Sequence, residues 1–102
     1  MNEAKKWFKK SKEDLDTAKA CFRIKKFEAS AFYSQQAAEK ALEALQIKDT
    51  GEFSKVHDLL LLANKVGAPK HICDCCAKLS SYYTITRYPD IEEPISGAVV
   101  KI

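Results

Sequence analysis

The chain has 102 residues, of which 46% are hydrophobic and 30% are charged, a balance typical of a soluble globular protein of one domain. Its longest strictly apolar run, residues 59–63, is far shorter than the ~20 residues that a membrane-spanning helix needs. The Lys-rich N-terminus also lacks an apolar signal core, so we predict a cytoplasmic protein without a membrane span. The formal net charge of +3 favours contact with phosphates, but it is too small to indicate nucleic-acid binding by itself.

Apolar residues recur at helical spacing in four segments, and no strand-like alternation occurs in the sequence. The segments cover about residues 3–24, 28–46, 56–66 and 69–86. We predict an all-α fold, an up-down antiparallel helical bundle of four main helices that forms a single domain over residues 1–102. Residues 91–102 stand apart as an atypical short C-terminal tail.

Turn and cap residues separate the predicted helices. An Asp-Thr-Gly triplet at residues 49–51 lies at the centre of the loop predicted for residues 47–56. Ser54 is the expected N-cap of the third helix, and Gly67 is the glycine expected just past its end. Pro69 then opens the fourth helix, where its missing N–H costs nothing.

The first helix has one apolar stripe and a lysine-rich opposite side. The stripe, which we expect to be buried, consists of Ala4, Trp7, Phe8, Leu15, Ala18, Cys21 and Phe22. On the other side, the spacing of four residues predicts the ion pairs Lys9/Glu13, Lys10/Asp14 and Lys12/Asp16. Such pairs favour a solvated face over a patch that binds nucleic acid.

The second helix places a glutamine on its buried stripe, which runs through Phe27, Ala31, Gln35, Ala38, Leu42 and Leu45. Gln36 lies beside Gln35. A buried amide needs hydrogen-bond partners, which are either a neighbouring backbone, the same residue of a second subunit, or a bound ligand. Several alanines make this helix thin, which favours a tightly packed bundle or a dimer interface.

The tetrad Arg87-Tyr88-Pro89-Asp90 follows the fourth helix, which Pro89 prevents from continuing. In a structural interpretation, Arg87 neutralises the negative end of the helix and pairs with Asp90. The side chains that cover the edge of the core are then Tyr82, Tyr83 and Tyr88. In a functional interpretation, the guanidinium binds a phosphate and a tyrosine stacks on a base, as suits a nucleotide or single-stranded RNA. The sequence leaves both open.

Residues 71–76, His-Ile-Cys-Asp-Cys-Cys, contain a Cys-x-x-Cys pattern that suggests a metal or redox site. Zinc sites usually draw on two separated pairs of ligands, and thiol exchange usually requires a strand followed by a helix. Buried, inert cysteines are therefore the simpler interpretation, and we predict no metal site and no cofactor.

Three motifs, in this order, resemble the HEPN family of small helical domains. They are A-F-Y-S-Q-Q-A-A-E-K-A-L-E-A-L at residues 31–45, H-D-L-L at residues 57–60 and T-R-Y-P-D at residues 86–90. The resemblance spans about residues 4–90. It implies a helical bundle that forms a homodimer, and a role beside a minimal nucleotidyltransferase in a two-component, toxin–antitoxin-like system. It also implies either RNA cleavage or nucleotide binding.

The chain departs from the RNA-cutting HEPN pattern, in which a His follows the Arg after four to six residues. No histidine follows Arg87, and both histidines, His57 and His71, precede it. Because His is the usual proton-transfer group near neutral pH, we assign no catalytic residue. Ribonuclease activity remains an alternative if His57, which otherwise caps or packs at a helix start, lies close to Arg87 in the fold. Where the resemblance implies a last helix after the tetrad, we expect only the short apolar segment ISGAVVKI at residues 95–102, so that either the chain is cut short or another element covers the bundle.

The sequence thus favours a binding module for a nucleotide or RNA over an enzyme. The predicted ligand-binding residues are Arg87, Tyr88, Tyr83, Asp90, Gln35, Gln36, Lys40 and His57.

Overall fold

The computed structural model describes residues 2–54 and 58–86. For Asn2 and residues 82–86 it describes the backbone alone. These residues form four α-helices and no strand, which confirms the predicted all-α bundle. The helices are α1 (Asn2–Arg23), α2 (Phe27–Thr50), α3 (Leu59–Lys65) and α4 (Lys70–Thr86).

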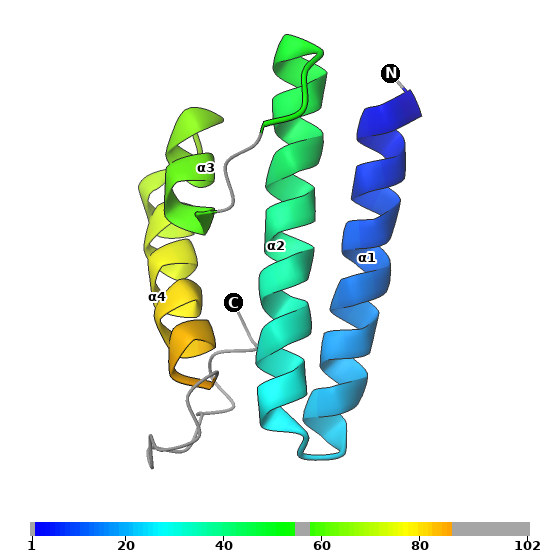
Figure 1. Ribbon diagram of the computed structural model, residues 1–102, viewed down its shortest axis with the longest axis vertical. Helices are drawn as coiled ribbons and strands as arrows, with labels where there is room; N and C mark the ends of the chain where they lie inside the picture. The colour runs from blue at the N-terminus through cyan, green and yellow to red at the C-terminus, as the bar shows by residue number, and fades with distance from the viewer. Residues whose placement is uncertain (1, 55–57, 87–102) are drawn as a thin grey trace.

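Helix α2 is the central element of the bundle. Helix α1 runs antiparallel along one side of it, and α3 and α4 pack on its other side (Figure 1). Among the described helices α1 packs on α2 alone, its Trp7 ring also lies 5.0 Å from that of Phe53 in the following loop, and no Cα atom of α1 lies within 8 Å of one in α4. The bundle is therefore held together through α2, and a space remains between α1 and α4 over one face of this helix.

Helix α2 continues four residues further at its C-terminal end than predicted. In the last turn of the helix, the hydroxyl of Thr50 donates a hydrogen bond to the Gln46 carbonyl at 2.8 Å. It ends at Gly51, whose backbone has φ +77° and whose N–H donates to the Ile47 carbonyl at 2.7 Å. A glycine stops the helix here because this left-handed conformation disfavours residues with a side chain.

The α3 helix begins later than predicted, and Ser54 is not its cap. Asp58 is the N-cap, with its Oδ1 accepting a hydrogen bond from the Leu61 N–H at 3.0 Å. A carboxylate is well placed there because it binds an N–H that lacks a helical partner and opposes the positive end of the helix. Ser54 is instead buried, and its own N–H donates to the Glu43 carboxylate.

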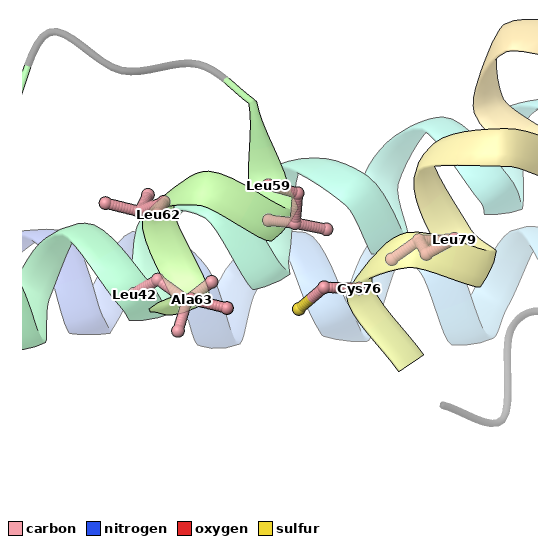
Figure 2. Packing of buried hydrophobic residues seen from close by; sticks show 6 residues of the cluster. All are labelled: Leu42, Leu59, Leu62, Ala63, Cys76 and Leu79. Atoms are coloured by element: carbon pink, nitrogen blue, oxygen red, sulfur yellow. The ribbon is translucent and has the colours of Figure 1, made fainter. Parts of the chain in front are cut away.

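The hydrophobic core lies between α2, α3 and α4. Its buried members are Leu42, Leu59, Leu62, Ala63, Cys76 and Leu79 (Figure 2). Helix α3 has only seven residues, too few to be stable alone, so burial of Leu59 and Leu62 holds it in place.

The predicted buried stripe of α1 is only partly buried. Ala18 is buried as expected, but Phe8 and Leu15 are 48% and 39% exposed. The reason is that α1 meets α2 through small residues. Ser11 donates to the Ala37 carbonyl at 2.9 Å, and Ser30 of α2 donates to the Ala18 carbonyl at 2.7 Å. Two backbones this close leave the large α1 side chains at the edges of the contact.

Replacing Leu59 with Ala tests whether α3 depends on the core. Leu59 is fully buried, so we expect the free energy of unfolding to fall by about 2–5 kcal/mol. Leu61 in the same helix is 59% exposed, and Leu61→Ala should cost less than about 1 kcal/mol. Urea denaturation followed by circular dichroism measures both, and equal losses would contradict the packing described.

Candidate functional site

The structure describes four of the eight predicted ligand-binding residues, and one of these as backbone only. Gln35, Gln36 and Lys40 lie on α2, and the backbone of Tyr83 lies in the last turn of α4. The remaining four, His57, Arg87, Tyr88 and Asp90, lie outside the described residues. The grouping of these eight residues into one site therefore stays a prediction.

Gln35 is buried, as its position on the stripe predicted, with 7% of its surface exposed. Its Oε1 has no hydrogen-bond partner among the described residues, and neither has the hydroxyl of Ser34 beside it. A buried polar atom without a partner costs about 1–3 kcal/mol, so it is usually satisfied by water or by a group from outside the chain. Two adjacent residues of α2 thus each hold a polar atom that is shielded from solvent and has no partner among the described residues.

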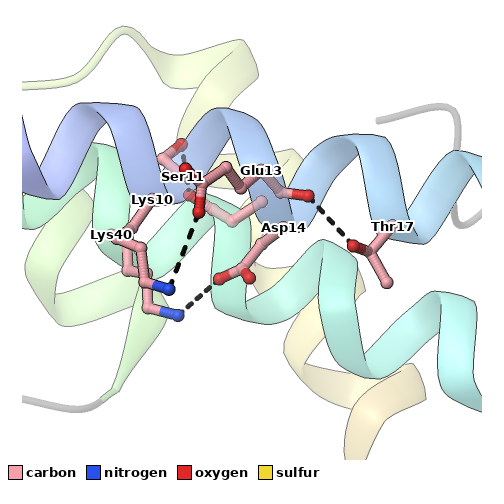
Figure 3. Close-up of polar contacts among 7 residues, drawn as sticks. Lys10, Ser11, Glu13, Asp14, Thr17 and Lys40 are labelled. Carbon is pink, nitrogen blue, oxygen red and sulfur yellow. Dashed lines mark hydrogen bonds and ion pairs between the residues drawn. The ribbon is translucent and has the colours of Figure 1, made fainter.

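Lys40 forms an ion pair with Asp14 of α1 (Figure 3). The two side chains are only 21% and 14% exposed, so the pair is largely shielded from water and joins α1 to α2. A ligand phosphate would have to compete with this carboxylate for the ammonium group.

The charge pairing predicted along α1 is different in the structure. Asp14 pairs with Lys40 rather than with Lys10, because its carboxylate lies on the side of α1 that faces α2. Lys10 pairs instead with Glu13, at 3.6 Å (Figure 3).

Glu43 is a polar residue of α2 that the sequence did not single out. It is 2% exposed, and its Oε1 accepts a hydrogen bond from the Ser54 backbone N–H. The hydroxyl of Ser54 is in turn 3.4 Å from the ammonium group of Lys65. The carboxylate therefore fixes the chain just before residues 55–57, the segment that contains His57.

The cysteines of α4 face different surroundings. The Cys73 Sγ lies 3.4 Å from the Asn64 Oδ1 and 3.6 Å from the Ala68 carbonyl oxygen, and its single proton forms a weak hydrogen bond to one of the two at a time. Cys76 lies in the hydrophobic core, while Cys75 is partly exposed. In residues 2–54 and 58–86, no three His, Cys, Asp or Glu side chains are grouped so as to hold a metal ion. The described residues thus give no support to a metal site at residues 71–76.

Burial raises the pKa of the Cys76 thiol to about 11, with a smaller contribution from the neighbouring thiols of Cys73 and Cys75. The thiolate is the nucleophilic form of cysteine, so Cys76 is protonated and unreactive near neutral pH. This property does not suit a redox centre.

Comparison with known proteins identifies the class of this bundle. The family model described as HEPN domain matches residues 4–100. The chain therefore belongs to the HEPN family, and the resemblance found in its motifs is confirmed. This membership supports a nucleotide- or RNA-related module.

A solved structure is similar to the bundle over nearly its whole length. The crystal structure of TT1696 from Thermus thermophilus superimposes with a TM-score of 0.79 at 29% sequence identity. The match covers 96% of this chain and 80% of that chain. No curated protein matched the chain. None of the described helices has the length and hydropathy needed to cross a membrane.

A double-mutant cycle on Asp14 and Lys40 tests the shielded ion pair. Asp14→Asn, Lys40→Met and the double variant should give a coupling energy of about 1–3 kcal/mol, between the values for exposed and fully buried pairs. Glu3 and Lys6 provide the matched control, because they are 3.8 Å apart with side chains 67% and 74% exposed. Their coupling should stay below about 0.5 kcal/mol. If the coupling energy of Asp14 and Lys40 were no larger than this, the pair would not be shielded from water as described.

Thiol labelling at pH 7.5 tests the protonation of Cys76. In the folded protein Cys75 should react at least tenfold faster than Cys76, and mass-spectrometric fragmentation distinguishes the two sites. In denaturant both should react alike. Faster labelling of Cys76 than of Cys75 in the folded protein would be incompatible with its place in the core.

The same thiol makes stability depend on pH in one direction. The pKa of Cys76 is higher in the folded chain, at about 11, than in the unfolded chain, where a free thiol has a pKa of about 8.5. Its contribution is therefore fully present below pH ~8.5 and is lost as the pH rises towards 11. The difference in unfolding free energy between wild type and Cys76→Ala should shrink over this interval in urea titrations.

Proposed function

We propose that this chain is the HEPN half of a two-component system, that it binds a nucleotide or RNA, and that it acts beside a minimal nucleotidyltransferase. The observation that carries the proposal is the family match over residues 4–100, which includes the T-R-Y-P-D motif. A cytoplasmic location and a homodimer belong to the same proposal.

The arginine of the motif supplies the affinity for phosphate. Arg87 directly follows Thr86, the last residue of α4, and so lies where a rigid helix passes into the following segment. Its guanidinium binds phosphate oxygens through paired hydrogen bonds, and Tyr88 and Tyr83 provide rings that stack on a base. Asp90 and His57 belong to the same proposed site.

The neighbouring helix contributes amide groups. The Oε1 of Gln35 is buried without a partner among the described residues, which supports a role in binding a group from outside the chain. Gln36, one residue further along α2, is partly exposed and adds a second amide. Lys40 contributes its charge only where a ligand draws it away from Asp14.

The Arg87→Ala variant tests the binding site. Titration with nucleotides and short single-stranded RNA should show affinity lower by about tenfold to a hundredfold, since a charge-assisted hydrogen bond contributes about 1.5–3 kcal/mol. Arg23, exposed at the end of α1, is the only other arginine and provides the control Arg23→Ala. If wild type and Arg87→Ala bound these ligands with equal affinity, Arg87 would not belong to the binding site.

An RNA-degradation assay separates binding from catalysis. Under the proposal, wild type leaves RNA intact, and so do Arg87→Ala and His57→Ala. Cleavage by wild type that both substitutions abolish would replace the binding module with a ribonuclease in which His57 stands in for the absent downstream histidine.

Sedimentation equilibrium at several protein concentrations tests the homodimer. A mass that stays at 11.5 kDa up to about 100 μM would rule out a stable dimer.

A further inference from the structure

An apolar trough runs along one face of the bundle, in the space where α1 and α4 do not meet. It consists of two adjoining cavities of about 750 and 270 Å³ that share Ala41 of α2 in their lining. Its sides carry Phe8 and Leu15 of α1, Leu45 of α2 and Ile72 of α4. We call this surface the α1–α2–α4 trough.

Four of the large apolar side chains that line the trough are unusually exposed. Phe8 is 48% exposed, Leu45 47%, Leu15 39% and Ile72 36%. Single exposed apolar residues need no explanation, whereas several on one concave surface indicate a binding surface. The trough floor is formed by small residues of α2, such as Ala38 and Ala41, which let another backbone approach closely.

The dimensions of the trough suit one short helix. Along α1 its lining extends from Ala4 to Leu15, and along α2 from Ser34 to Lys48. At 1.5 Å per residue these stretches are roughly 17 and 21 Å long, the length of a helix of about 11–14 residues. Such a helix would lie against α1 and α2 along the whole trough and against α4 beside the smaller cavity, as in helix-in-groove recognition.

The charges at one end of the trough are all positive. Lys5 and Lys48 line the larger cavity, and the Lys12 ammonium lies 4.9 Å from the centre of the Phe8 ring. No aspartate or glutamate of the described residues lines either cavity, and Lys5 and Lys48 form no ion pair with a described residue. Positive potential at the rim favours an occupant with carboxylates beside its apolar stripe.

We propose that the α1–α2–α4 trough binds an amphipathic helix of a partner protein, with an apolar stripe that packs between α1 and α4 and with acidic residues that meet Lys5 and Lys48. A second copy of this chain is the poorer occupant. In a two-fold dimer built on this surface, each trough would face the same apolar and lysine-lined surface, to which the described residues contribute no carboxylate.

The probe is a designed 14-residue helical peptide with Leu and Ile on one face, Glu beside them and a fluorescent label. Its control is the same peptide with every Glu replaced by Lys. Fluorescence anisotropy with the full chain should show at least tenfold tighter binding of the Glu peptide at 50 mM salt. The difference in affinity between the two peptides should shrink at 500 mM salt, because salt screens the attraction between the glutamates and the lysines.

Three variants locate the binding. Leu15→Gln should lower the affinity for the Glu peptide at least tenfold. Leu61→Gln, on the exposed side of α3, should leave this affinity unchanged. The double variant Lys5→Glu, Lys48→Glu should reverse the preference between the two peptides. Circular dichroism verifies that each variant is folded.

Several outcomes would overturn the proposal. The first is that the Glu peptide does not bind when the protein is at 100 μM. The second is that both peptides bind with equal affinity, and the third is that Leu15→Gln does not lower the affinity for the Glu peptide. A wild-type dimer that Leu15→Gln converts to a monomer, and that excludes the peptide, would show that a second copy occupies the trough instead.

Discussion

The close contact between α1 and α2 is the constraint on which the rest of the structure depends. Hydroxyls of Ser11 and Ser30 each bond to a carbonyl of the opposite helix, and these bonds require a close approach of the two backbones that only small residues allow. The Asp14–Lys40 ion pair then joins the same two helices near Ser11 (Figure 3). Because α1 meets α2 through small groups, its large apolar side chains are left for the edges, and one edge becomes the trough.

The sequence predicted the helices and the polar residue inside them, but not how completely each helix is covered. Periodicity identifies the apolar face of a helix, and it correctly placed Gln35 among the buried residues. It cannot tell how many neighbours pack on that face, so the exposure of Phe8 and Leu15 was missed. Four helices could be read from the chain, whereas the absence of contact between the described parts of α1 and α4 could not.

Contacts between helices were the least predictable part of the candidate site. The pairing of Lys40 with Asp14 depends on how far α1 and α2 are shifted along each other, and spacing within one helix suggested Lys10 instead. Glu43 was missed because it binds a backbone N–H, which any residue other than proline supplies, so no sequence pattern marks it. The resemblance to the HEPN family, in contrast, came from residue types in a fixed order, and the family match confirmed it.

The order of the helices has a consequence for how the chain reaches its folded form. Residues 24–26 alone connect α1 to α2, and α3 and α4 are likewise separated by only residues 66–69. Each half is thus a local hairpin that assembles from segments close in sequence, and such topologies fold rapidly because little loop entropy is lost before contacts form. The slower event is then the docking of the second hairpin on α2, where Leu42 meets Leu59 and Leu79.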